Sequence, residues 1–326
     1  MLPSLGSHAV RALTPQTAVT VDHSRCVRHR CKRNECSKCL EICPVDAITW
    51  DERGLHVSPS DCTQCLRCLS VCPTAALTSP ELSLLQVFTD LAKHPDPVLG
   101  CNHSPEIKTH AHLSCLGFLA DPELMLLLAL VFRDGVQINL TRCEGCPNGH
   151  VLDDVHGAHD QLAALLPDHK VALIRNRDRL KYKPTSLSRR ELFGFFRENS
   201  TRTAMVMVER LQVSSRMQSY GCKQVPQVRT MLLKVMETLP VIQRRVAEQL
   251  FCQIAFTETC TACGGCVGVC PTGAIDPSDE DNSSPVFDQT LCVSCGSCQA
   301  FCRKQGLQLM TASNPKKATS LASAWK

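Results

Sequence analysis

The sequence predicts a three-part fold, with two small α+β modules of similar sequence towards the ends of the chain and a small α/β domain between them. Most of the 23 cysteines of this 326-residue chain lie in residues 20–80 and 250–312. The runs CTQCLRCLSVCPTAAL from Cys62 and CTACGGCVGVCPTGAI from Cys260 share their cysteine spacing, which is typical of one module used twice. Residues 97–176 alternate strand-like and helical segments, as in an α/β domain.

Within the middle segment the clearest predicted helix begins at Asp121-Pro122, a capping residue followed by a favourable first helical residue. It is predicted to stop at Gly135. Residues 226–251 also have helical character, interrupted or kinked at Pro240. The predicted domains are therefore 18–82 and 251–312 for the two modules, 95–176 for the α/β domain, and 177–250 for a linker and helical region.

The composition restricts the class of protein. A net charge of +4 gives no general case for binding nucleic acid, and closely spaced C-x2-C pairs in a chain of this size indicate metal binding rather than a disulfide framework. Residues 1–16 lack the apolar core of a signal peptide, and the longest apolar run, 124–132, has about half the length of a membrane span. The Ser-Arg-Arg motif at Ser188 resembles an export signal, but with Glu191 it predicts a capped helix start. We therefore expect a cytoplasmic protein without a transmembrane segment, while peripheral association with a membrane complex stays open.

Four cysteine runs carry the chemistry of the two modules. They are CSKCLEICP from Cys36, CTQCLRCLSVCP from Cys62, CTACGGCVGVCP from Cys260 and CVSCGSCQAFC from Cys292. These runs resemble those of two-cluster bacterial ferredoxins, so the resemblance implies ferredoxin-like 2[4Fe–4S] modules at both ends and four [4Fe–4S] clusters in total. In that family three cysteines of one run hold one cubane and the fourth crosses to the other.

Carried over to this chain, the resemblance implies four sets of ligands. The first set is Cys26, Cys36, Cys39 and Cys72; the second is Cys62, Cys65, Cys68 and Cys43; the third is Cys260, Cys263, Cys266 and Cys302; the fourth is Cys292, Cys295, Cys298 and Cys270. Arg303 stands where the proline of the last run is expected. Zinc ribbons also use C-x2-C pairs, but they draw four ligands from two pairs, whereas these runs supply three cysteines plus one. The pattern therefore favours iron–sulfur clusters.

The first ligand of the first set needs a separate inference, because Arg33 occupies the position three residues before Cys36. An apolar residue lies five positions before Cys62, Cys260 and Cys292, as expected for a strand that leads into the first ligand. Val21 lies five positions before Cys26, and Asp22 precedes Cys26 by four residues just as Asp288 precedes Cys292. We therefore predict Cys26 as the ligand and residues 27–35 as an extended loop. Cys31, with a shorter loop, is the alternative.

The middle segment holds four further cysteines: Cys101, Cys115, Cys143 and Cys146. Each lies near the end of a predicted strand, where the ligands of α/β sheets gather. The arrangement distantly resembles the four-cysteine domains of thioredoxin-like [2Fe–2S] ferredoxins and of small electron-transfer subunits associated with hydrogenases and heterodisulfide reductases. It predicts a fifth metal site, for which an iron–sulfur cluster is favoured over zinc or unligated thiols.

These features predict an electron-transfer protein. Cubanes held by cysteine alone offer no open coordination position to a substrate, and the sequence contains no nucleotide-binding glycine motif. We expect a polyferredoxin-like chain that relays single electrons within or to a multi-subunit oxidoreductase, with protein donors and acceptors. Two alternatives remain: a reductase with a catalytic metal site in the middle domain, and a factor for iron–sulfur cofactor assembly or redox sensing.

Overall fold

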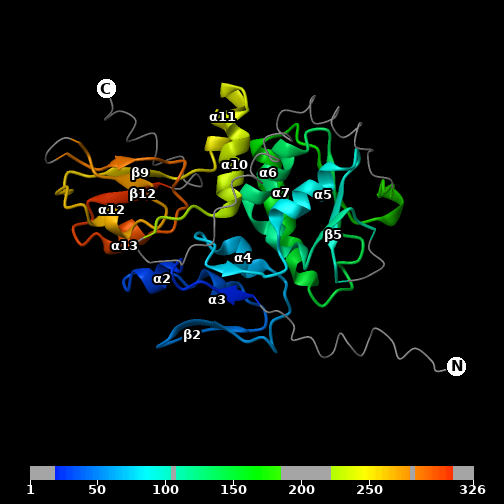
Figure 1. The fold of residues 1–326 in the computed structure, drawn as a ribbon, viewed down its shortest axis with the longest axis horizontal. Coiled ribbons are helices and arrows are strands. Elements are labelled where there is room, and N and C mark those ends of the chain that lie inside the picture. The colour runs from blue at the N-terminus through cyan, green and yellow to red at the C-terminus, as the bar shows by residue number, and fades with distance from the viewer. Residues whose placement is uncertain (1–18, 104–107, 185–221, 280–282, 311–326) are drawn as a thin grey trace.

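The computed structural model describes residues 19–103, 108–184, 222–279 and 283–310. The helix predicted to begin at Ser188 lies outside these residues. Figure 1 shows the N-terminal module below the centre, the C-terminal module at the left and the middle domain at the right. Helix α10 (Gln227–Glu237) stands between the middle domain and the C-terminal module.

The N-terminal module consists of two short antiparallel strand pairs and three short helices. Strand β1 (Thr20–Val21) pairs with β4 (Leu77–Thr78), and β2 (Ile48–Asp51) pairs with β3 (Gly54–Val57). The helices are α2 (Val27–Arg30), α3 (Lys38–Ile42) and α4 (Arg67–Val71). The β2–β3 turn is closed by a 2.7 Å hydrogen bond from the Arg53 amide to Asp51 Oδ1, and Gly54 supplies the φ of +114° that follows it.

The C-terminal module repeats this arrangement. Strand β9 (Gln253–Phe256) pairs with β12 (Leu307–Met310), and β10 (Ile275–Asp276) pairs with β11 (Val286–Phe287). Its helices are α12 (Gly265–Val269) and α13 (Ser297–Phe301). In both modules the strand before the first cysteine run pairs with the strand after the second run. Both ends of each module are therefore joined by backbone hydrogen bonds.

The strand register predicted from the sequence is confirmed at all four positions, because Val21, Val57, Ala255 and Phe287 each lie in a strand. The extended loop predicted for residues 27–35 is wrong. Residues 27–30 form the one-turn helix α2, in which the amides of Arg30 and Cys31 donate 2.9 Å hydrogen bonds to the carbonyls of Cys26 and Val27. Burial of the Val27 side chain anchors this turn, which is too short for its periodicity to be visible in the sequence.

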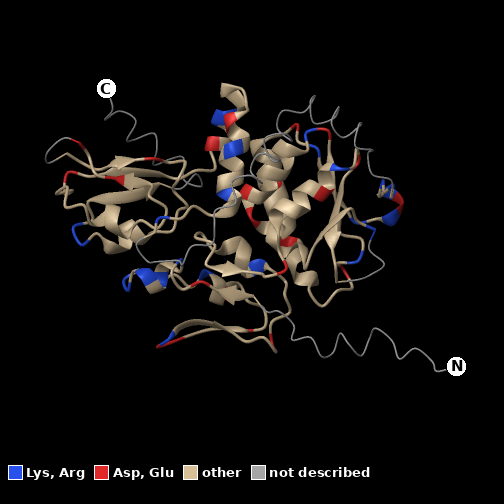
Figure 2. Cartoon of the chain, in the orientation of Figure 1, with Lys and Arg blue, Asp and Glu red and all other residues tan. Residues whose placement is uncertain are grey.

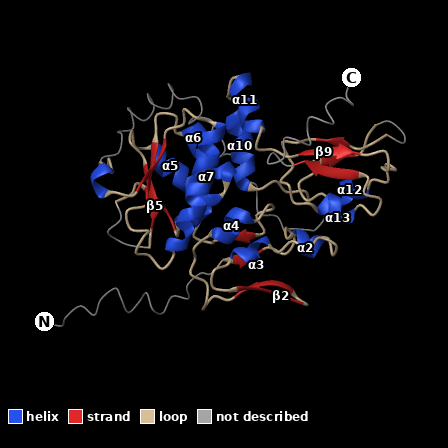
Figure 3. Cartoon of the chain, turned by 180° about the vertical axis from the view of Figure 1, so that it is seen from behind, coloured by secondary structure: helices blue, strands red, loops and turns tan. Residues whose placement is uncertain are grey.

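A four-stranded parallel sheet forms the centre of the middle domain. Its strands are β5 (Val98–Cys101), β6 (Ala111–Leu113), β7 (Val136–Asn139) and β8 (Val171–Ile174), in the order β6-β5-β7-β8. Helix α6 (Pro122–Val131), preceded by the short 3-10 helix η1 (Leu116–Ala120), connects β6 to β7. Helix α7 (Leu152–Leu165), preceded by η2 (Gly149–Val151), connects β7 to β8, and a third 3-10 helix, η3 (Arg177–Arg179), follows β8. These two connections run in the same direction along the sheet, so α6 and α7 cover one face and contact each other (Figure 3).

Helix α6 begins where the sequence predicts. The Asp121 side chain caps it by accepting a 2.8 Å hydrogen bond from the Glu123 amide, and Pro122 is its first residue. The helix ends at Val131, before the predicted stop at Gly135, whose φ of +132° belongs to the following turn. The apolar run 124–132 is buried on all sides. Among the described residues, no helix has the length and apolar character needed to cross a membrane.

One apolar core joins the N-terminal module, the parallel sheet and the adjacent helices α5 (Leu84–Ala92) and α10. Met231, Leu232 and Val235 of α10 are fully buried where this helix packs on α6. After Pro240 the chain continues as α11 (Val241–Glu248), which confirms the predicted interruption. The C-terminal module has two small apolar clusters of its own, so polar contacts matter more for its attachment.

Candidate iron–sulfur sites

The turn after the fourth cysteine has the same geometry in all four runs. The residue three positions later has positive φ each time: Asp46, Ala75, Gly273 and Gln305 follow Cys43, Cys72, Cys270 and Cys302. In three of these turns the next amide donates to the cysteine sulfur, from Ala76 at 3.2 Å, Ala274 at 3.3 Å and Gly306 at 3.2 Å. The turn after Cys302 keeps this geometry although Arg303 replaces proline. These amides stabilise negative charge on the sulfur atoms.

The loops between the first three cysteines are also alike in three runs. The residues on either side of the second cysteine have positive φ: Gln64 and Leu66, Ala262 and Gly264, and Ser294 and Gly296. Four of the six are not glycine, so the left-handed conformation is imposed on residues that disfavour it. Backbone turns of this kind direct consecutive amides into a concave space suited to a negatively charged group.

The structure brings the sixteen predicted module cysteines together in four sets. The first site is a small cavity lined by Cys26, Cys36, Cys39 and Cys72 with Trp50 and Leu55. The second site is a cavity lined by Cys43, Cys62, Cys65 and Cys68 with Val19 and Ile48. The third site is one wall of a larger groove and consists of Cys260, Cys263, Cys266 and Cys302. The fourth site is a cavity lined by Cys270, Cys292, Cys295 and Cys298 with Ile254 and Leu309. Each set combines three cysteines of one part of a module with one cysteine of the other part, as the resemblance implied.

The thiols in each set suit a positively charged metal cluster. Burial, reinforced by the neighbouring thiols of Cys72, Cys36 and Cys26, raises the pKa of Cys39 to about 12. Burial and the thiols of Cys295 and Cys270 raise the pKa of Cys298 to about 12 in the same way. Four thiolates confined together repel one another unless cations bind among them, and iron in a cubane supplies such cations. The residues present therefore fit [4Fe–4S] clusters.

Cys26 occupies the same place in its site as Cys292 does in the fourth site. The amides of Asp22 and Asp288 bond to the carbonyls of Ala76 and Ala274, at 2.8 and 2.9 Å, four residues after the crossing cysteine. Each aspartate then accepts a hydrogen bond from the amide two residues later, at 2.9 Å from Ser24 and 2.8 Å from Thr290. Cys31 is also buried, but it lies outside the cavity of the first site and lines the groove at the third site.

Comparison with protein families agrees with this repeated geometry. The family described as the 4Fe-4S dicluster domain matches residues 30–76 and again residues 259–305. The chain contains two 4Fe-4S dicluster domains. They imply about four [4Fe–4S] clusters and confirm the predicted pair of ferredoxin modules. The first match begins after Cys26, and no match covers the parallel sheet. No curated protein matches the chain.

Between the two dicluster domains, the four middle cysteines converge at the carboxyl end of the parallel sheet. Cys101 ends β5, Cys115 follows β6, and Cys143 and Cys146 follow β7, and these three strands are neighbours in the sheet. Burial and the nearby thiols of Cys101 and Cys146 raise the pKa of Cys143 to about 12. Among the described residues, no three His, Cys, Asp or Glu side chains are spaced to hold one metal ion.

The middle cysteines lie directly against the second site of the N-terminal dicluster domain. The Cys65 thiol is near enough to Cys115 to contribute, after burial and Cys101, to the raised pKa of Cys115, which is about 12. Gly117 packs so closely that a Cβ atom there would lie 2.1 Å from the Cys65 carbonyl oxygen. Asn148 Nδ2 donates at 3.0 Å to the carbonyl of Thr63, which lies between Cys62 and Cys65 of the second site. The two groups of cysteines therefore form one continuous region.

A single buried side chain joins the first site to the fourth. Asn34 Oδ1 accepts a 3.1 Å hydrogen bond from the Cys36 amide, and Asn34 Nδ2 donates at 3.0 Å to the Cys295 carbonyl. The same Nδ2 lies 3.1 Å from Ser297 Oγ. Asn34 thus connects Cys36 of the N-terminal dicluster domain to Cys295 of the C-terminal one, and 261 residues of sequence separate Asn34 from Cys295.

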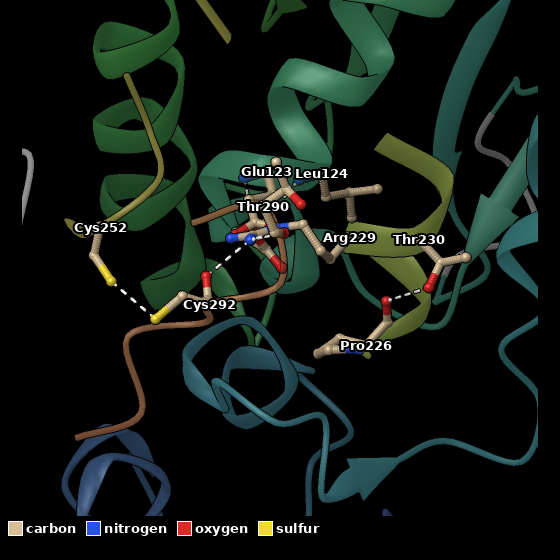
Figure 4. A network of polar contacts seen from close by, with 9 residues as sticks. Glu123, Leu124, Pro226, Arg229, Thr230, Cys252, Thr290 and Cys292 are labelled. Atoms are coloured by element: carbon tan, nitrogen blue, oxygen red, sulfur yellow. Dashed lines mark hydrogen bonds and ion pairs between the residues drawn. The ribbon is translucent and has the colours of Figure 1, made fainter. Parts of the chain in front are cut away.

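Arg229 of α10 attaches the fourth site to the middle domain (Figure 4). Its guanidinium, 2% exposed, pairs with both carboxylate oxygens of Glu123 and donates to the carbonyls of Thr290 at 2.6 Å and Cys292 at 2.8 Å. Figure 4 also shows Cys252 beside Cys292, with their sulfurs 3.0 Å apart. Sequence reasoning missed Arg229 and Cys252, because neither belongs to a spaced motif.

Proposed function

We propose that this protein relays single electrons along a row of four [4Fe–4S] sites, as a polyferredoxin-like component that works with protein donors and acceptors of an oxidoreductase. A cubane of this type, when bound, takes up and releases one electron at a potential set by its surroundings. The protein supplies the order of the sites, their burial and the hydrogen bonds to their sulfurs. The observation that carries the proposal is the Asn34 bridge between the Cys36 and Cys295 ligand loops.

The proposed order of the row rests on the contacts between the cysteine loops. The third and fourth sites share the C-terminal dicluster domain, and the first and second share the N-terminal one. The Asn34 hydrogen bonds support the first and fourth sites as neighbours, and the packing of Gly117 on Cys65 with the Asn148–Thr63 hydrogen bond supports the second site and the middle cysteines as neighbours. The proposed sequence of sites is therefore third, fourth, first, second, and then the middle cysteines.

Cys26 is the proposed first ligand of the first site. It shares a cavity with Cys36, Cys39 and Cys72, and its approach through Asp22 matches that of Cys292 through Asp288. Helix α2 then fills the insertion between Cys26 and Cys36, and it leaves Cys31 outside the cavity of the first site.

The Asn34 bridge gives a direct test of the relay. One electron introduced by flash photoreduction into the anaerobic full-length protein should redistribute among the sites at a rate independent of protein concentration. We expect Asn34→Ala to slow this redistribution by at least about tenfold, or about 1.4 kcal/mol in activation free energy. The reason is that the contact between the first and fourth sites loses a buried hydrogen-bonded group.

The matched control is Asn148→Ala, which removes a buried asparagine from the contact between the middle domain and the second site. It leaves the Asn34 hydrogen bonds in place. Transient absorbance and freeze-quench electron paramagnetic resonance (EPR) follow the redistribution. A rate that rises with protein concentration, or an unchanged rate in Asn34→Ala with full iron content, would contradict a relay between the first and fourth sites at Asn34.

We further propose that Cys101, Cys115, Cys143 and Cys146 hold a fifth iron–sulfur cluster at the end of this row. The support is their convergence from three neighbouring strand ends and the close packing of Gly117, two residues after Cys115, on the Cys65 carbonyl. Changing both Cys143 and Cys146 to serine should lower the iron content of the full-length protein by about two to four atoms. The spectrum of the dicluster domains should not change. Iron analysis and EPR measure both effects, and the double variant Cys31→Ser/Cys222→Ser is the control. Unchanged iron in the Cys143/Cys146 variant would leave four clusters.

A further inference from the structure

A groove of about 740 Å³ lies beside the third site, where the two dicluster domains meet. Its walls include the four cysteines of the third site and five basic residues: Arg30, Lys32, Arg33, Arg303 and Lys304. The described residues that line it include no aspartate or glutamate. The groove therefore places a concentrated positive charge next to a redox site.

The third site is also the one nearest to solvent in the described structure. Cys263 is the only exposed residue among the sixteen module cysteines, whereas two or three ligands of the second and fourth sites are buried. The third site is one end of the proposed row. Electrons can enter or leave most directly at such an exposed end.

The basic residues come from two segments that are distant in sequence. Lys32 and Arg33 follow α2, and Arg303 and Lys304 follow α13; Figure 2 shows the blue of α2 below the C-terminal module. Lys32, Arg303 and Lys304 are exposed and form no ion pair with any described acidic residue. Within the described structure their charges therefore face solvent without a carboxylate partner.

Arg303 supports a functional origin for this charge. Proline follows the fourth cysteine in the other three runs, after Cys43, Cys72 and Cys270. The turn after Cys302 nevertheless keeps both the positive φ at Gln305 and the hydrogen bond from the Gly306 amide to the sulfur. The arginine is not required by the turn, and what it adds is positive charge on the groove.

We propose that this groove docks an acidic electron-transfer protein, which exchanges one electron with the third site; this inference rests on the relay proposed above. Phe301 lines the groove with 43% of its surface exposed, so an apolar patch lies within the basic rim, an arrangement typical of protein interfaces. In the exchange the partner's cofactor loses one electron and the third site gains it, or the reverse. No covalent bond forms or breaks.

The test uses reduced flavodoxin, a small acidic flavoprotein, as the probe and the full-length cluster-loaded protein as the acceptor. Stopped-flow absorbance gives the rate of electron transfer, and fluorescence anisotropy of labelled flavodoxin gives the affinity. For the wild type we expect fast transfer at low ionic strength that slows as salt is added. The double variant Lys32→Glu/Lys304→Glu should transfer electrons roughly 10- to 100-fold more slowly at low salt and bind correspondingly more weakly.

The matched control is Arg179→Glu/Lys181→Glu, which changes the net charge equally at two exposed positions away from the groove. It should stay within about twofold of the wild type, since steering depends on where the charge lies. Iron content and reduction by dithionite show that each variant holds its clusters. If the groove variant loses iron, Lys32→Gln/Lys304→Gln replaces it.

Three results would overturn the docking proposal. One is equal slowing in both double variants, and another is no transfer from flavodoxin to a wild type that dithionite reduces fully. The third is a groove variant that dithionite, a small anion, reduces more slowly, while the rate of electron transfer from flavodoxin is unchanged. This result would assign the groove to small anions. Each leaves the relay standing, whereas a wild type without clusters would remove the relay itself.

Discussion

Cys26→Ser should remove or destabilise one cluster of the N-terminal dicluster domain, whereas Cys31→Ser should leave the iron content unchanged. Cys26 shares a cavity with Cys36, Cys39 and Cys72, while Cys31 is buried outside it beside the third site. With one ligand missing, we expect a loss on the order of one to four irons per chain.

Both substitutions replace a thiol by a hydroxyl within the same short segment, so Cys31→Ser is a matched control for the change in size and polarity. Iron analysis and EPR of the anaerobically purified proteins distinguish the two variants. Loss of iron from Cys31→Ser with full iron in Cys26→Ser would move the ligand to Cys31, and α2 would then have to rearrange.

Arg229→Met should cause the largest loss of stability among the substitutions considered. It removes a buried guanidinium and leaves the Glu123 carboxylate and the carbonyls of Thr290 and Cys292 without their donors. Breaking a buried ion pair by removing one partner costs about 3–5 kcal/mol. At about 3 kcal/mol, bleaching of the cluster absorbance in guanidinium should be on the order of 100-fold faster than in the wild type.

The double variant Arg229→Met/Glu123→Gln should recover part of this loss, because it removes the unpaired charge. Arg229→Lys should be intermediate, since an ammonium group cannot reproduce the forked contacts. A bleaching rate of Arg229→Met within about twofold of the wild type would show that Arg229 does not hold the fourth site against the middle domain.

The stability loss caused by Arg229→Met should also depend on pH, because Asp121 lies close to Glu123 and Arg229. Burial and the neighbouring Glu123 raise the pKa of Asp121 to about 7, from an ordinary value of 3.8. A raised carboxyl pKa favours the folded state most below the ordinary pKa, and this contribution is lost as the pH rises through about 7. The stability loss of Arg229→Met should therefore grow between pH 6 and pH 8. In this range Asp121 becomes a second negative charge beside Glu123, and the variant lacks the guanidinium that offsets it.

The parts of the fold that the sequence predicted depend on local spacing. Runs such as the one from Cys62 fix which cysteines meet, and the apolar residue five positions earlier predicted the strands around Val21 and Phe287 correctly. The helix at Asp121-Pro122 was predictable because its capping signals are local.

The contacts between domains could not be predicted in this way. Asn34 meets Cys295 across 261 residues and Arg229 meets Glu123 across 106, and no periodic pattern marks such single pairs. The short helix α2 was missed because four residues carry no helical period. The position of Cys31 beside the third site depends on that helix and on the packing of the two dicluster domains.

Metal and acid-labile sulfide analysis of the anaerobically purified full-length protein tests the central claim most directly. Four [4Fe–4S] sites predict at least about sixteen irons and sixteen sulfides per chain, with little zinc. A chain with zinc, little iron and no labile sulfide would contradict the account, because the cysteine sets would then be structural metal sites and the row could not carry electrons.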